Sequence, residues 1–252
     1  MRTIVRLVLL LVALFWGLQA ATRSDVNTIE AAENIRYLSQ KIARDYLYLY
    51  SRPQRSELKK TLNKMIEQLK QNFTTIASST QDSDTKDLLK YLAYNTEEME
   101  KLFTDRVTKE QAQQMLDYSE VLLEAAESIA REHSYPFNTE EKMFMNIKRY
   151  EYLIVRLGKF YMASHLGVLS PTNRKKMEES TQALSKGVRL IHQYRYPQDL
   201  EKTKKHLDLF WQADQHFLAH SDKMFIPNVV VIENDQFETI LGRFALYHSK
   251  QQ

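Results

Sequence analysis

The sequence contains no cysteine, and this single absence excludes several kinds of site. Without a thiolate there is no disulfide, no cysteine nucleophile, no zinc–thiolate centre, no lipid-modified cysteine and no covalently attached c-type haem. A chain of 252 residues can nevertheless bury enough apolar surface to fold without disulfides. We therefore expect a hydrophobic core to carry its stability.

Glycine and proline are also scarce, with five of each in the chain, while 27% of the residues are charged. So few helix breakers indicate long helices. Between the breakers, apolar residues recur every three or four positions, which predicts an all-α fold. The expected helices lie at residues 25–50, 55–77, 84–103, 108–133, 139–165, 172–193, 198–221 and 228–249.

The chain has little net charge, since its formal charge of +3 includes Arg2 and Arg6 at the extreme N-terminus. Removal of these two residues with a leader would bring acidic and basic side chains almost into balance. A protein that binds nucleic acid needs a concentrated basic face. We therefore expect no nucleic-acid partner.

Long apolar runs are absent after the first 20 residues. Before that point, Arg2 and Arg6 precede an apolar run at residues 7–18, which is the layout of a secretory signal peptide. The run is shorter than the roughly 20 residues that a membrane span needs. We expect residues 1–20 to be a signal peptide cleaved near Ala20, with an uncleaved anchor as the alternative, and the remaining chain to be periplasmic.

The sequence does contain an internal likeness. Shifted by 115 residues without gaps, the chain matches itself between residues 37 and 134. The matches include Tyr37 with Tyr152, Leu38 with Leu153, Tyr46 with Tyr161, Lys41 with Arg156, Lys90 with Lys205 and His133 with His248. A constant offset indicates a duplication. We therefore expect two tandem antiparallel four-helix bundle modules, at residues 21–135 and 136–252.

A polar row interrupts the first expected helix. Arg36, Ser39, Gln40 and Ala43 share one helix face because they are spaced three and four residues apart. The guanidinium offers a planar fork of donors suited to a carboxylate, a nitrate or a similar flat anion. The small Ala43 would allow close approach of a second helix. We interpret the row as a candidate ligand-binding site.

The stretch around this row resembles a known family. Residues 29–50, IEAAENIRYLSQKIARDYLYLY, are similar to the first helix of the PilJ-type sensory domain, the extracytoplasmic part of type IV pilus chemotaxis transducers, and to the nitrate and nitrite sensor domain of NarX-type histidine kinases. The matching positions are Ile29, Ala32, Arg36, Leu38, Ser39, Gln40, Ala43 and Arg44, whereas Glu33 replaces a glycine of the family pattern.

The resemblance implies a helical sensor that works as a dimer. In the nitrate sensors, arginines at the position of Arg36 from both subunits hold one anion. Glu33 lies one helical turn before Arg36 and could neutralise it. In the second half of the chain, Glu151, Ile154 and Val155 replace Arg36, Ser39 and Gln40, so the candidate site is expected in the first half alone.

Three functions follow from these observations. The first is signal transduction: a homodimeric sensor binds a small solute, such as nitrate or nitrite, at Arg36, Ser39, Gln40 and Ala43. It then signals through a membrane receptor, a kinase or a cyclase. The second is a non-sensing periplasmic scaffold or accessory subunit, in which Arg36 pairs with Glu33 or with a partner's carboxylate.

The third and weakest alternative is a metal carrier. His216 and His220 are spaced i, i+4 on one expected helix, which is suitable for zinc or copper; a pair of surface histidines is the simpler interpretation. The sequence has no Glu-x-x-His motif, no Ser/His/Asp arrangement and no glycine-rich phosphate loop. We therefore expect no enzymatic activity and no cofactor.

Overall fold

The computed structural model describes residues 23–55, 57–103, 107–220 and 223–251. The expected signal peptide, residues 1–20, lies outside these described residues. All regular secondary structure in the described part is α-helical, which confirms the predicted all-α class. Among the described helices, none has both the length and the apolar character that a bilayer span requires.

Eight helices make up the described part of the chain, each close to a predicted one. They are α2 (Arg23–Ser51), α3 (Glu57–Ser79), α4 (Ser83–Lys101), α5 (Lys109–Glu132), α6 (Thr139–His165), α7 (Pro171–Gln193), α8 (Gln198–Ala219) and α9 (Pro227–Ser249). The periodic apolar residues and the scarcity of breakers account for their length.

Several helices begin at residues that satisfy the free N–H groups of a first turn. The Thr108 side chain accepts from the Gln111 N–H at the start of α5, and Asn138 accepts from the Glu141 N–H at the start of α6. The side chains of Gln111 and Glu141 bond back to the cap residues, completing capping boxes. These caps fix where α5 and α6 begin.

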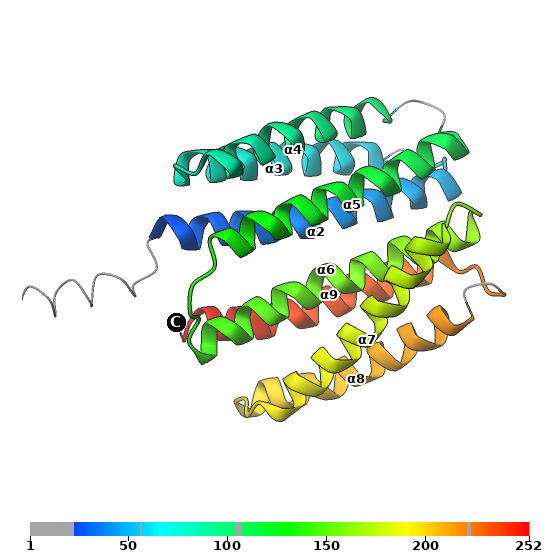
Figure 1. Ribbon diagram of the computed structural model, residues 1–252. Coiled ribbons are helices and arrows are strands. Elements are labelled where there is room, and N and C mark those ends of the chain that lie inside the picture. Colours follow the sequence, from blue (N-terminus) through cyan, green and yellow to red (C-terminus); the bar gives the residue numbers. More distant parts are fainter. Residues whose placement is uncertain (1–22, 56, 104–106, 221–222, 252) are drawn as a thin grey trace, which may run out of the picture.

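The helices lie roughly side by side in a stack (Figure 1). α2 packs against α3 and α5, and α4 packs against α3 and α5, so these four helices form the N-terminal half. α6 packs against α7 and α9, and α8 packs against α7 and α9, which forms the C-terminal half. The two halves meet chiefly where α2 packs on α6.

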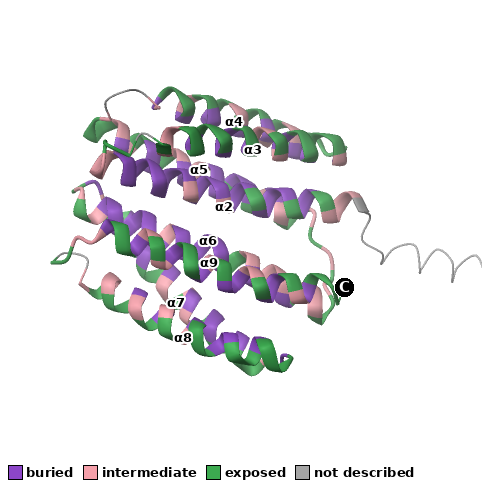
Figure 2. Ribbon diagram, turned by 180° about the vertical axis from the view of Figure 1, so that it is seen from behind, coloured by how far each residue is buried: buried purple, intermediate pink, exposed green. Residues whose placement is uncertain are grey.

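Apolar side chains fill each half and also connect the two. One cluster is confined to α2–α5 and their connections, and a second lies mainly among α6–α9. A third cluster joins the halves through residues such as Leu47, Leu116, Tyr161 and Val230. Figure 2 shows that buried residues are concentrated on the central helices and exposed ones on the outer helices. Each large apolar side chain buried in this way contributes about 1.5–3 kcal/mol.

Candidate functional site

Arg36 lies inside the molecule with only 7% of its surface exposed. Its Nη1 donates to Glu33 Oε1 at 2.6 Å, and its Nη2 donates to the Tyr152 hydroxyl at 2.6 Å. The guanidinium carbon also lies 4.3 Å from the centre of the Tyr152 ring, and Glu127 Oε2 is 3.8 Å from Nη2. Both Nη groups of the guanidinium that was predicted to bind an anion are therefore bonded within the chain, to Glu33 of the same helix and to Tyr152 of the C-terminal half.

The Arg36–Glu33 pair is incompletely satisfied. Burial raises the pKa of Glu33, and the neighbouring Arg36 offsets only part of this effect. Burial alone would lower the pKa of Arg36, but Glu33, together with Tyr152 and Glu127, outweighs it and raises that pKa. Arg36 Nε and Glu33 Oε2 are buried and have no hydrogen-bond partner among the described residues. One buried donor, Nε, and one buried acceptor, Oε2, therefore lack a hydrogen-bond partner at this position of the described chain.

Ser39 and Gln40 are also buried and bonded within the chain. The Ser39 hydroxyl donates to the Arg36 carbonyl at 2.8 Å, as a helix-internal bond. The Gln40 Nε2 donates to the Ser119 carbonyl at 2.9 Å, and its Oε1 accepts from Lys159 Nζ at 2.6 Å. The Gln40 amide therefore bridges α5 and α6.

Ala43, the last member of the predicted row, is fully buried. Its equivalent 115 positions later is Gly158 on α6, which lies at a close approach of helices. A Cβ added at Gly158 would lie 2.0 Å from Asn234 Oδ1 and 3.2 Å from Arg44 Cδ. The row thus belongs to a buried seam, which we define as the contact of α2 and α5 with α6, α7 and α9.

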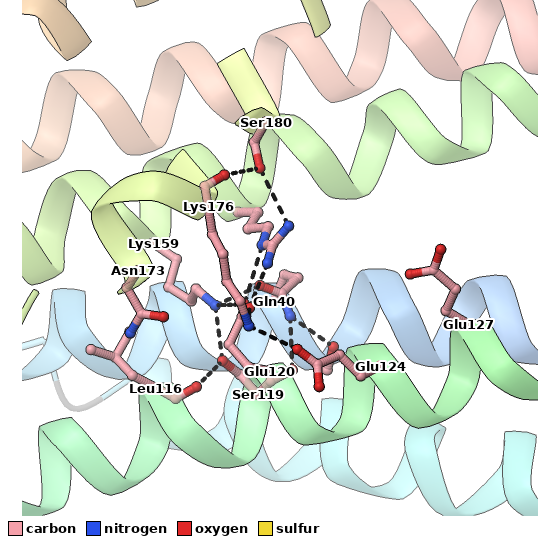
Figure 3. A network of polar contacts seen from close by, with 12 residues as sticks. Gln40, Leu116, Ser119, Glu120, Glu124, Glu127, Lys159, Asn173, Lys176 and Ser180 are labelled. Carbon is pink, nitrogen blue, oxygen red and sulfur yellow. Dashed lines mark hydrogen bonds and ion pairs between the residues drawn. The ribbon is translucent and has the colours of Figure 1, made fainter. Parts of the chain in front are cut away.

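On one side of the seam, three cations converge on Glu120 of α5 (Figure 3). Lys159 Nζ on α6 lies 2.6 Å from Glu120 Oε1, and Lys176 Nζ on α7 lies 2.9 Å from Oε2. Arg156 on α6 donates to both carboxylate oxygens, from Nε at 3.1 Å and from Nη2. Lys176 also reaches Glu124 at 2.8 Å. We call these five residues the α5 cluster.

The buried charges of the α5 cluster are surrounded by hydrogen-bond partners. The Lys159 ammonium is fully buried and donates to Gln40 Oε1, Ser119 Oγ and Glu120 Oε1. Burial lowers the pKa of Lys159, but three acceptors, one of them ionised, favour the charged form. Burial alone would raise the pKa of Glu120; Lys159 and Arg156 outweigh it and hold that pKa well below its usual range.

On the other side of the seam, Arg44 of α2 corresponds to Lys159, which lies 115 residues later in the sequence. The Arg44 side chain is almost completely buried and bonds to Asp45 at 2.9 Å, to Asp235 of α9 at 2.9 Å and to Glu238 of α9 at 3.2 Å. Lys41 bonds to Glu238 at 2.7 Å. Burial alone would lower the pKa of Arg44, but the carboxylates outweigh it and raise that pKa. We call these five residues the α9 cluster.

A second buried polar pair lies between α8 and α9. Asn234 Nδ2 donates to Asp214 Oδ1 at 3.4 Å, whereas Asp214 Oδ2 and Asn234 Oδ1 have no partner among the described residues. Burial, with a smaller effect of Glu233, raises the pKa of Asp214 to about 8. A proton on Asp214 would remove the cost of burying its negative charge.

The histidine pair forms only a two-residue arrangement. The rings of His216 and His220 are 4.5 Å apart, and His220 Nδ1 lies 2.9 Å from the His216 carbonyl oxygen. Two aspartates next to the pair in the sequence could add metal ligands, but Asp214 is buried and Asp222 is not among the described residues. Within the described chain, no group of three or more His, Asp or Glu residues is arranged to hold a metal ion.

Four surface hollows of the described part of the chain lie away from the polar row. The largest by volume of four such hollows, about 510 Å³, lies between the start of α5 and the α6–α7 turn, where Lys109, Gly167 and Ser170 contribute to its lining. The others are grooves beside α7 and a small apolar hollow at the start of α2. None of these four is lined by a residue of the predicted row.

Comparison with known proteins gives no relative from which a function could be transferred. No family model, curated protein or solved structure matches the chain. The residues must therefore be interpreted from their own contacts.

The seam contains charged residues that the sequence interpretation did not single out as a site. Lys159, Glu120 and Asp235 were missed because a charged residue on a helix usually faces solvent. The 115-residue offset could have revealed them if positions had been compared by the sign of their charge and not only by residue identity. It relates Arg44 to Lys159 and Glu120 to Asp235.

Proposed function

We propose that the protein is a non-catalytic helical adaptor that acts outside the cytoplasm and consists of two tandem four-helix units, residues 21–135 and 136–252. The observation that carries this proposal is the use of Arg36 and Gln40 in contacts between the two halves of one chain, with Tyr152 and with Lys159. Polar side chains that bond between α2 and α6 in this way hold the two helices in register. Specificity of register is the best-attested use of buried polar groups.

The contacts of Arg36 favour the adaptor over the anion sensor. A flat anion binds two adjacent N–H groups of a guanidinium, and both Nη groups already donate, to Glu33 and to Tyr152, at 2.6 Å. An incoming anion would have to displace one of these partners and would be buried beside the Glu33 carboxylate. A second buried negative charge next to that carboxylate is strongly unfavourable.

Solute sensing of the PilJ or NarX kind is the second candidate, and one observation supports it. Arg36 Nε and Glu33 Oε2 are buried and unpartnered. A small solute that carries both an acceptor and a donor, such as an undissociated carboxylic acid, would satisfy both atoms without displacing the existing pair. Its binding would be passed to a membrane receptor, a kinase or a cyclase through a shift of α2.

Thermal unfolding with added solutes distinguishes the two candidates. We expect nitrate, nitrite and acetate, at pH values down to 5, to change the melting temperature no more than chloride does at equal ionic strength. A sensor would instead gain about 2.7 kcal/mol at a hundredfold excess over Kd, or about 5–10 °C, and Arg36→Ala would abolish that gain. Such a solute-specific gain would overturn the adaptor proposal.

Site-specific photo-crosslinking in the cell of origin tests the adaptor directly. Tyr94 on α4 and Leu209 on α8 are the positions to label, because they are 59% and 63% exposed and are separated by the same 115 residues. We expect a discrete adduct with a membrane protein from at least one of them. Labels at Lys64 on α3 and Lys175 on α7, which are charged, exposed and on other helices, provide the control. Adducts that are equally frequent at all four positions would contradict a dedicated docking surface.

A further inference from the structure

We propose that the seam is a closed two-fold interface whose partner is the other half of the same chain, so that the protein is a monomer with the internal symmetry of a dimer. This inference rests on the two-unit organisation proposed above and replaces the homodimer expected from the resemblance. It follows from pairs of residues that share one sequence offset and make reciprocal contacts.

The first reciprocal contact joins the two most deeply buried cations of the seam to acidic residues. Arg44 of α2 bonds to Asp235 of α9, 2.9 Å away, and Lys159 of α6 bonds to Glu120 of α5, 2.6 Å away. Lys159 lies 115 residues after Arg44 in the sequence, and Asp235 lies 115 residues after Glu120. The first helix of each half therefore pairs with the last helix of the other half, as a two-fold axis requires.

A second cation repeats the same pattern one turn earlier. Lys41 lies 3.5 Å from Asp235, and Arg156 donates to Glu120 at 3.1 Å. Lys41 and Arg156 are again 115 residues apart. In each half, two cations on the first helix thus converge on one carboxylate of the other half. In an isologous interface, a contact of residue i with residue j implies a contact of j with i.

Contacts inside each half repeat with the same offset. His133 Nδ1 lies 3.1 Å from Asp25 Oδ1, and His248 Nδ1 lies 2.6 Å from Glu140 Oε2. Each pair joins the start of the first helix of a half to the end of its last helix. Because 115 residues separate both the histidines and the acids, the two halves have the same internal arrangement as well as the same helix order.

The hydroxyls of Tyr46 and Tyr161 provide a further repeat. Tyr46 donates to the Leu102 carbonyl at 3.0 Å, just after α4, and Tyr161 donates to the Met224 carbonyl, between α8 and α9. Both tyrosines thus fix the connection between the third and fourth helices of their own half. The two acceptors are not 115 residues apart, but they lie in corresponding connections. Contacts within the halves therefore show that the halves are alike, and the contacts between them carry the two-fold relation.

The seam has diverged so that its two sides are no longer interchangeable. The α5 cluster gains Lys176 and Glu124, and it has one more cation than carboxylate. The α9 cluster gains Asp45 and Glu238, and it has one more carboxylate than cation. The two sides of the seam therefore carry opposite surpluses of charge. A second copy cannot take the place of either half at the seam, because each half already occupies the other there.

Two engineered cysteine pairs test the closure of the seam within one chain. Because the sequence has no native cysteine, a thiol reagent will react only with the engineered ones. The full chain would carry Lys41→Cys with Asp235→Cys in one variant and Glu124→Cys with Lys176→Cys in the other. These residues are partly exposed, and their replacement leaves Arg44, Lys159 and Glu120 in place. Each variant is treated with a short bis-maleimide and separated under denaturing conditions.

Both variants should give a crosslinked product at the mass of one chain, with a yield that does not depend on protein concentration. The four single-cysteine variants should give no two-chain product, and light scattering of the unmodified protein should give the mass of one chain. A two-chain product from either pair that increases with concentration would overturn the proposal. So would the lack of any crosslink in protein whose cysteines react with a monofunctional maleimide. Neither result depends on the solute or docking experiments.

Discussion

Three cations converge on the Glu120 carboxylate, and this convergence determines how the residue responds to substitution. The side chain is buried, and two of its partners, Lys159 and Arg156, are themselves largely buried. A buried pair adds little net stability relative to apolar packing, but removal of one member leaves the other charge uncompensated. Such residues are therefore sensitive to substitution even where their net contribution is small.

Replacement of Glu120 by Gln should destabilise the protein by about 3–5 kcal/mol, because Lys159 and Arg156 lose their ionised acceptor. Urea denaturation would measure the change. The matched control is Glu67→Gln, which removes an exposed pair with Lys70 and should cost no more than about 1 kcal/mol. Equal losses for the two variants would contradict the assigned role of Glu120.

The low pKa of Glu120 also predicts an acid-labile contribution. Since Lys159 and Arg156 hold this pKa below its usual range, the contribution is fully present above the ordinary carboxyl pKa of 4.5 and is lost as the pH falls below it. The stability difference between wild type and Glu120→Gln should therefore shrink between about pH 5 and pH 2. A difference that stays constant over this range would contradict the prediction.

Asp214 should produce the opposite dependence on pH. Burial raises its pKa from 3.8 to about 8, so between these values the folded state holds a proton that the unfolded state has released. Stability should therefore fall as the pH rises through this window, by up to about 1.4 kcal/mol per pH unit, and level off above it. In Asp214→Asn this part of the slope should disappear. Parallel profiles for the two proteins would show that Asp214 is ionised in the folded state.

At the scale of single elements, α6 illustrates what the sequence could predict. Its extent follows from apolar periodicity and from the Asn138 cap, both of which are local features. The burial of polar residues on α6 and α2 could not be predicted locally, because Gln40 meets Lys159 across 119 residues of sequence. Helical spacing places Arg36, Ser39 and Gln40 on one face, but it does not show whether that face meets solvent or another helix.

The packing of α6 against α9 depends on a missing side chain at Gly158. An added Cβ would lie 2.0 Å from Oδ1 of the buried Asn234 on α9, so Gly158→Ala should displace that side chain from its bond to Asp214 and cost about 1–3 kcal/mol in thermal or urea unfolding. Gly242 on α9 is the matched control, because nothing lies within 4 Å of its added Cβ. Gly242→Ala should stabilise by about 0.5–1 kcal/mol, since alanine is the better helix former. Equal effects would contradict the close approach.

At the scale of the whole molecule, the seam makes two sets of four helices into one body. Both ion clusters and the shared apolar cluster cross it, so neither half can lose its structure without exposing apolar surface and buried charge on the other. The proposed tandem organisation can be inferred from the 115-residue offset in the sequence. The reciprocal pairing was not, because the offset relates equivalent residues and does not show which of them touch.

The most direct test of the seam as a permanent joint is the cooperativity of unfolding. In the chain without residues 1–20, Trp211 on α8 is the single tryptophan and reports on the C-terminal half, whereas far-ultraviolet circular dichroism reports on all helices. We predict that the two signals follow one coincident transition in urea. A dichroism curve with a second transition at a urea concentration where Trp211 does not respond would show that the halves unfold independently, and would contradict the account.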